Sequence, residues 1–179
     1  NVNLVELSVS HYLLARALDT VDLKEADITV VNTSDADLVA AFTTPDVTAA
    51  VTWNPLLSEI EAFPDAHKVF DSSQIPGEII DIMMVNTETL RDNPDFGKAL
   101  VAAWYDAMTL MAKETGDEAP ARSAMAEASG TDLAGFNAQL ATTQMFYDPA
   151  DAVAFVNDEK LVETMKFVAQ FLFDHGILG

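Results

Sequence analysis

Residues 2–18, VNLVELSVSHYLLARAL, decide the fold of this chain. Apolar residues crowd the start of this stretch and recur at helical spacing from Leu13 onward, so the hydrophobic period changes across Ser8-Val9-Ser10. The change predicts a buried strand that passes through a polar turn into a helix beginning at His11-Tyr12. Such a turn presents free backbone N–H groups and the positive end of a helix dipole. It predicts either a site for a small polar or anionic ligand, or a helix that Ser10 merely caps.

The same alternation of strand and helix occurs twice more in the first half of the chain. Strands are predicted over 27–32 and 47–52, and helices follow Ser34-Asp35 and Trp53-Asn54-Pro55. This order is typical of βαβ units on a parallel sheet, whose ligands bind beyond the carboxyl ends of the strands. The three polar strand exits are therefore expected to converge on one edge of the sheet.

The sequence changes character after these three units. A short strand is predicted over 68–70, and the apolar run IIDIMMVN (79–86) predicts a buried strand interrupted by Asp81. A carboxylate in such a run is costly unless it is paired or faces a cavity, so Asp81 is either a paired structural acid or a site residue. Beyond residue 93 the pattern predicts helices alone, over 96–111, 116–128, 132–142 and 158–173.

The composition argues against several classes of function. With 29 acidic and 9 basic residues the net charge is −20, which repels nucleic acids and anionic membrane surfaces, although it also fits a simple solvating surface. The chain has no cysteine, which excludes a disulfide framework, a thiolate nucleophile and a cysteine-based zinc site. Because it begins with Asn1 directly on a strand, we expect a mature or excised fragment of a longer protein.

Motifs for catalysis are missing. His11, His67 and His175 lie far apart without metal-ligand spacing to a partner acid, and His175 is expected to cap the end of the last helix. The chain contains no GxGxxG, GxxxxGK[ST] or GxSxG motif. The adjacent side chains of Ser10 and His11 diverge, which disfavours a Ser/His nucleophile. We therefore expect a binding protein, not an enzyme, with no metal and no cofactor.

Several segments together carry a family resemblance. They are SxSHYLLARAL, SDADLVAAF, AAVTWNPLL, SSQIPGEIIDIMMVN, NPDFGKALVAAWY and the C-terminal stretch from TTQMFYDPADAV onward. The chain thereby resembles the nitrate/taurine/sulfonate type of ABC-transporter solute-binding protein, in the NMT1/THI5-like branch that includes urea-binding members. This resemblance implies an α/β fold of the type II periplasmic-binding-protein class, in which two lobes close on a solute and deliver it to a membrane permease.

The resemblance also implies an organisation and a location. Residues 1–80 would form an α/β lobe, and 81–179 a crossing strand and helices that pack on it and on a second lobe. Family members are usually longer, so we expect an incomplete two-lobe fold, with a homodimer or an exchange of elements covering exposed core. The location implied is periplasmic or otherwise extracytoplasmic.

By the same resemblance, solute contacts come from the strand exits and from the acids near the crossing strand. Trp53 would supply an aromatic wall or belong to the core, while Glu78 and Asp81 would contact amine-like groups or form hinge structure. An oxoanion would prefer the helix start at Ser10, and a neutral polar solute or a zwitterion could use both. The candidate ligand-binding residues are Ser8, Ser10, His11, Tyr12, Ser34, Asp35, Trp53, Asn54, Glu78 and Asp81.

Two other functions share this fold. An effector-binding domain of a transcriptional regulator is the main alternative, and a basic helix-turn-helix segment upstream would favour it. An enzyme of the thiamin-pyrimidine synthase type would need a histidine-rich, cysteine-containing site, which this chain lacks.

Overall fold

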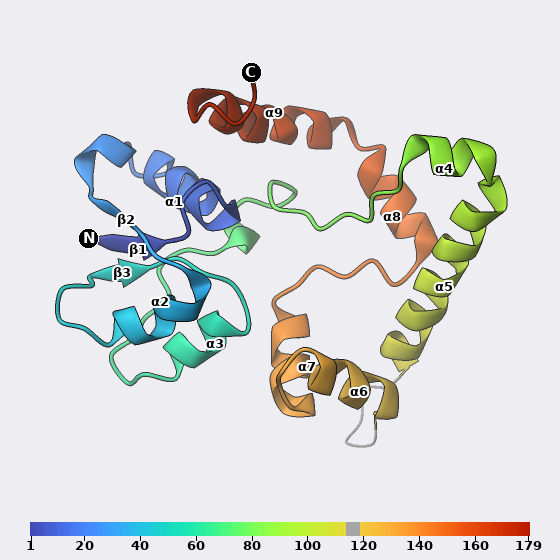
Figure 1. Cartoon of the computed structure of the whole chain (residues 1–179), viewed down its shortest axis with the longest axis horizontal. Helices are drawn as coiled ribbons and strands as arrows, with labels where there is room; N and C mark the ends of the chain where they lie inside the picture. The colour runs from blue at the N-terminus through green and yellow to red at the C-terminus, as the bar shows by residue number, and fades with distance from the viewer. Residues whose placement is uncertain (114–118) are drawn as a thin grey trace. The chain divides into compact units, whose positions relative to one another are not determined.

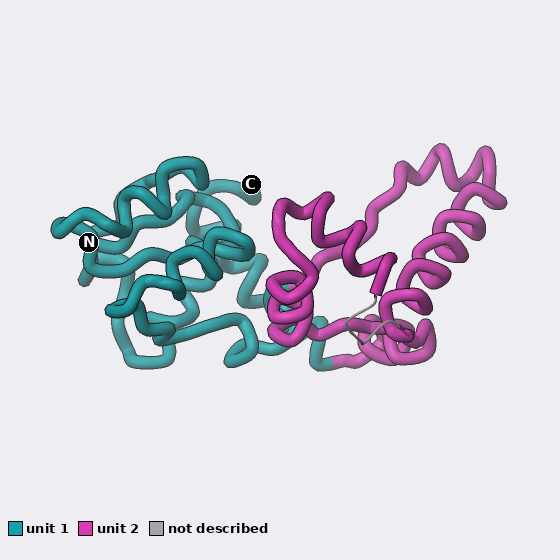
Figure 2. The backbone as a smooth tube through the Cα atoms, turned by 90° about the horizontal axis from the view of Figure 1, so that it is seen from below, with its two compact units in different colours: residues 1–79, 160–179 teal, residues 80–159 magenta. Residues whose placement is uncertain are grey.

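The computed structural model describes residues 1–113 and 119–179, which form two compact units (Figure 2). Unit 1 comprises Asn1–Ile79 and Lys160–Gly179, and unit 2 comprises Ile80–Glu159. The C-terminal helix therefore packs with the first unit. The physical reason is apolar packing, because this helix supplies Phe171 to a core cluster that also contains Tyr12 and Ile75 from the first half of the chain.

A parallel sheet lies at the centre of unit 1, as predicted. Its strands β1 (Val2–Leu4), β2 (Val30–Asn32) and β3 (Ala49–Ala50) are arranged in the order β2-β1-β3. Asn3 of β1 is in register with Val31 on one side and Ala50 on the other. Because the strands run in the same direction, their carboxyl ends share one edge.

The connections place helices on both faces of this sheet (Figure 1). The chain passes from β1 to β2 on one side, then crosses back over β1 to β3, so right-handed crossovers put successive helices on opposite faces. Helix α1 (Val9–Asp19) covers one face, where Leu4 is fully buried against Leu14 and Leu18. Helices α2 (Asp35–Phe42) and α3 (Leu56–Glu61) cover the other face.

A second core cluster joins α1 to the end of the chain. Helix α9 (Glu159–Asp174) places Phe171 against Tyr12 of α1 and against Ile75, which follows the short 3-10 helix η2 (Ser72–Gln74). The rings of Tyr12 and Phe171 meet edge to face, with centroids 5.3 Å apart. Unit 1 is therefore held by residues from both ends of the sequence.

The regular elements among the described residues of unit 2 are all helices, as predicted for the chain beyond residue 93. It contains α4 (Thr87–Asp92), α5 (Pro94–Lys113), α6 (Pro120–Ala128), α7 (Leu133–Ala141) and α8 (Pro149–Val156). The guanidinium of Arg122 on α6 donates to the Met111 carbonyl of α5 and to Asn137 Oδ1 of α7, each at 2.8 Å. Part of the helix predicted over 116–128 lies outside the described residues. None of the described helices is long and apolar enough to cross a membrane.

The strands predicted over 68–70 and 79–86 are wrong, since the structure has no strand there. The second run is irregular, and Ile82 and Met84 are 65% and 82% exposed. Asp81 is likewise exposed, so it is not the buried acid that the pattern predicted. Apolar composition favours a strand, but a strand also needs a neighbour for its backbone groups, and none of the described residues provides one here.

We expect Leu4→Ala to lower the free energy of unfolding by about 2–5 kcal/mol, because it leaves a cavity between β1 and α1. Urea denaturation followed by circular dichroism measures this change. Val69→Ala is the control: Val69 is 90% exposed, and its truncation should stay within about 0.5 kcal/mol of the original protein. Equal effects of the two substitutions would contradict the sheet core described above.

Candidate functional site

The three strand exits meet at the carboxyl edge of the sheet in unit 1, where the sequence predicted a ligand site. The loop Val5–Ser8 follows β1, Thr33 and Ser34 follow β2, and Val51–Asn54 follow β3. The edge thus gathers predicted residues from three separate parts of the sequence. Glu78 and Asp81 come from a different segment and do not belong to these exits.

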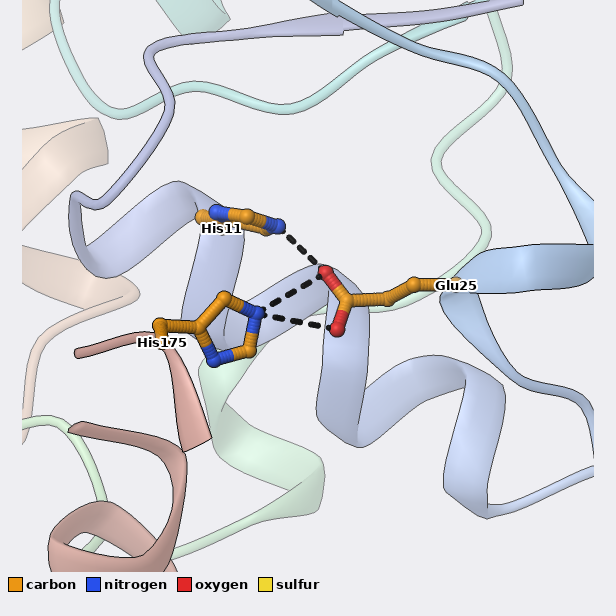
Figure 3. A group of neighbouring side chains, drawn as sticks. All are labelled: His11, Glu25 and His175. Atoms are coloured by element: carbon orange, nitrogen blue, oxygen red, sulfur yellow. Dashed lines mark hydrogen bonds and ion pairs between the residues drawn. The ribbon is translucent and has the colours of Figure 1, made fainter. Parts of the chain in front are cut away.

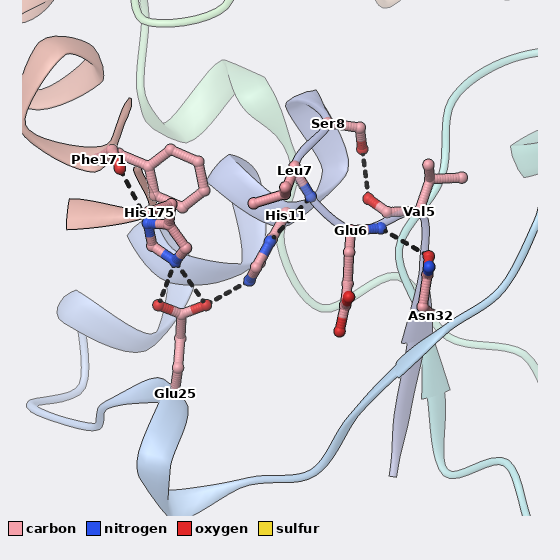
Figure 4. A network of polar contacts seen from close by, with 9 residues as sticks. All are labelled: Val5, Glu6, Leu7, Ser8, His11, Glu25, Asn32, Phe171 and His175. Carbon is pink, nitrogen blue, oxygen red and sulfur yellow. Dashed lines mark hydrogen bonds and ion pairs between the residues drawn. The ribbon is translucent and has the colours of Figure 1, made fainter. Parts of the chain in front are cut away.

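The loop after β1 satisfies its own polar groups (Figure 4). Ser8 Oγ donates to the Val5 carbonyl at 2.6 Å and accepts from the Ser10 amide at 3.1 Å. Ser8, not Ser10, is therefore the N-cap, and α1 begins at Val9, two residues before the predicted start. Leu7 has a left-handed backbone with φ 59°, and its amide donates to His11 Nδ1 at 3.1 Å. Ser10 and His11 are both buried.

At the other two strand exits, some of the polar side chains have hydrogen-bond partners. Ser34 Oγ donates to Asp37 at 2.6 Å, and Ser58 Oγ donates to Asn54 Oδ1 at 2.8 Å. The Trp53 side chain remains partly exposed. These contacts order the starts of α2 and α3 beside the edge.

Buried side-chain oxygens without a hydrogen-bond partner occur within β1, at the first residue of α2 and in the segment after β3. Within residues 1–113 and 119–179 the side-chain atoms in this condition are Asn3 Oδ1, Asp35 Oδ1 and Thr52 Oγ1. The orientation of the Asn3 amide is fixed, because its Nδ2 donates to Thr33 Oγ1 at 2.9 Å and that hydroxyl donates to the Val31 carbonyl. Unpaired buried oxygens are costly, and they call for a donor from outside the chain.

Tyr12 and Glu78, both predicted to contact solute, are bonded to each other. The Tyr12 hydroxyl donates to Glu78 Oε2, and Arg16 donates to both carboxylate oxygens of Glu78 at 2.6 Å and 3.1 Å. Glu78 is 9% exposed. Burial, together with the hydrogen bond to Glu78, raises the pKa of Tyr12, while the hydrogen bond to Glu78 raises the pKa of Arg16. This cluster connects α1 to the segment after η2.

A second polar cluster was not predicted from the sequence (Figure 3). His11 of α1 and His175 beyond α9 both direct Nε2 at the carboxylate of Glu25 in the 3-10 helix η1 (Glu25–Asp27). His175 also caps α9, as predicted, with Nδ1 2.8 Å from the Phe171 carbonyl. Glu25 and His175 are 150 residues apart in the chain, so sequence spacing gave no sign of the cluster.

Two imidazoles and a carboxylate are donor types that hold divalent metals, and their ligand atoms lie within 4.8 Å of one another. The hydrogen bonds indicate another use. Since His11 Nδ1 accepts from the Leu7 amide, a neutral His11 ring carries its proton on Nε2 and has no lone pair there for a metal. We therefore assign this group as a hydrogen-bonded cluster.

The comparison with known families fits this geometry. The chain belongs to the NMT1-like family, whose model matches residues 4–128. No curated protein matches the chain. Family membership confirms the resemblance stated from the sequence and indicates a solute-binding role. The matched range includes all three strand exits.

We expect Glu78→Gln to lower the free energy of unfolding by about 3 kcal/mol, because it leaves the Arg16 guanidinium without its buried anion. Asp19→Asn removes the other carboxylate of the same guanidinium, but Asp19 is 61% exposed. Its loss should therefore cost less than about 1 kcal/mol. Urea titrations of both variants make the comparison, and a larger effect of Asp19→Asn would refute the assigned role of Glu78.

We expect Tyr12 to resist ionisation in alkaline solution. Its folded-state pKa is raised, so the neutral phenol stabilises the fold below the unfolded pKa, and that contribution is lost as the pH rises through the folded value. Of the three tyrosines, one should then stay protonated near about pH 11, where an ordinary tyrosine has ionised. Tyrosinate absorbance measures this, and Tyr12→Phe should remove only the resistant fraction.

Proposed function

We propose that this protein is the extracytoplasmic solute-binding component of an ABC importer. It would bind a small polar nitrogen- or sulfur-containing solute by lobe closure, without chemistry, and pass it to the membrane permease. The family supports solute binding, and the converging strand exits give such a solute a place to bind.

The observation that carries the proposal is the set of unpaired oxygens on Asn3, Asp35 and Thr52. An amide oxygen and a carboxylate oxygen can only accept hydrogen bonds, so their natural partners are N–H or O–H groups of a ligand. These oxygens favour a solute rich in N–H donors, such as urea or an aminopyrimidine, over an oxoanion. Arg16, a cation on α1, is already held by Glu78 and Asp19.

The other candidate residues have different roles in this proposal. Ser8, Ser10 and His11 shape the loop after β1, and Trp53 and Asn54 border the edge beside α3. Tyr12 and Glu78 form a buried clamp that holds α1 to the segment after η2. Asp81 lies in the exposed segment that leads out of unit 1 and serves as hinge structure in this proposal.

A thermal-shift screen followed by calorimetry tests the proposal, with urea, aminopyrimidines, taurine, other sulfonates, nitrate and bicarbonate as probes. A solute that binds the folded state raises the melting temperature by mass action. For the solute that does so, Asp35→Ala should weaken binding about tenfold, because it removes one buried acceptor. Asp37→Ala, in the same first turn of α2, is the matched control and should change affinity less than about twofold.

Three results would change the proposed function or the proposed solute class. If none of the probes raises the melting temperature, the proposal loses its support. If only oxoanions do so, the importer role stands and the preference for N–H donors is wrong. If both Asp variants bind equally well, the unpaired oxygens are satisfied by water and the solute binds elsewhere.

A further inference from the structure

We propose that His175 is held as an imidazolium by Glu25, and that its protonation fastens the end of α9 to η1 and to the loop after β1. The cluster of His11, Glu25 and His175 is then a proton-dependent clasp. This inference goes beyond solute binding and does not depend on it, because it concerns how unit 1 holds its C-terminal turn.

The charge of His175 follows from its two partners. Nδ1 lies 2.8 Å from the Phe171 carbonyl, which can only accept, so Nδ1 carries a proton. Nε2 faces both oxygens of Glu25, at 3.1 Å and 3.4 Å. In a neutral ring this nitrogen would present a lone pair to a carboxylate, whereas in the cation it donates a charge-assisted hydrogen bond. The geometry therefore requires both ring nitrogens to be protonated.

His11 completes the clasp as a neutral ring. It accepts from the Leu7 amide through Nδ1 and donates to Glu25 Oε1 through Nε2. The hydrogen bonds thus run without a break from Leu7 through His11, Glu25 and His175 to the Phe171 carbonyl (Figure 4). The protonation of His175 is thereby linked to the loop at the sheet edge.

The surroundings of His175 favour its charged form and leave its ring accessible to water. The His175 ring stacks on Phe171 with centroids 4.0 Å apart, an arrangement that suits a cation over an aromatic face. The side chains of His175 and Glu25 are 20% and 32% exposed, and that of His11 is 8% exposed. Two members of the clasp can therefore exchange protons with water.

Several other charged groups on the packed elements have partners of their own. On α1, Arg16 binds Glu78 and Asp19, and on η1, Asp27 accepts from the Lys24 amide. On α9, Asp174 accepts from Gln170, and beside η2, Asp71 pairs with Lys68. Lys24 itself is exposed next to Glu25. Glu25 is thus the anion that holds His175.

The consequence is that the attachment of the C-terminal turn depends on the proton that Nε2 of His175 donates to Glu25. When His175 loses its proton, Glu25 faces a lone pair, and the turn that carries His175 loses its attachment to η1. His11 keeps its bonds to Leu7 and Glu25. The end of α9 then opens more often at alkaline pH than at mildly acidic pH.

Hydrogen exchange of the folded chain tests this inference, with rates corrected for intrinsic pH dependence. We expect amide protection across 171–178 to fall about tenfold between about pH 5.5 and pH 8.5, as the charge-assisted hydrogen bond is lost. His175→Gln and Glu25→Gln should show the low protection at both pH values. His67→Gln is the matched control, because His67 is an exposed histidine of the same unit, and it should behave like the original protein.

Nitrogen NMR of the histidine rings gives an independent reading without any substitution. The clasp requires His11 to carry its proton on Nε2 and His175 to carry protons on both ring nitrogens. Protection that does not change with pH, or a neutral His175 ring at about pH 5.5, overturns the inference. A zinc-dependent rise in melting temperature that Glu25→Gln abolishes also overturns it, in favour of a metal site.

Discussion

The buried carboxylate of Glu78 joins α1 to the segment that follows η2, beside the core cluster of Tyr12, Ile75 and Phe171. It accepts from Tyr12 and Arg16 on α1, and Arg16 in turn lies over the Phe167 ring of α9, 4.4 Å from its centroid. The three strands are only two or three residues long, so their ladders bury little surface and leave the sheet dependent on what packs around it. Glu78 is thus linked to an ion pair and, through Arg16, to an aromatic ring of α9. A substitution of Glu78 affects both contacts.

Glu25 repeats this arrangement nearer the surface. Each of these carboxylates lies between α1 and a segment distant in sequence, and each accepts from two side chains. The difference lies in their partners. Arg16 keeps its charge at any physiological pH, whereas a histidine does not, so the buried clamp is permanent and the clasp responds to protons. Unit 1 thus combines a fixed connection with one that can be released.

The fold of unit 1 could be predicted where local pattern and tertiary structure agree. The order of strand, polar turn and helix occurs three times before residue 60. In each case the hydrophobic period of the sequence changes and polar residues stand before the helix. The pattern failed at 79–86, because apolar content says nothing of whether a neighbouring strand exists. It also failed for the cluster around Glu25, whose members have no common period and meet only through the return of α9. The converging edge was predictable, but the partners of Tyr12 and Glu78 were not, since they depend on side-chain packing.

The return of α9 to unit 1 has a consequence for how the protein is made. During synthesis, Tyr12 and Ile75 leave the ribosome long before Phe171, the third member of their core cluster. The helices of unit 2 emerge in between and can pack on one another. The apolar face of unit 1 stays uncovered during this time. Folding of the nascent chain therefore cannot finish from the N-terminus forward. It is completed only when α9 is available to cover that face.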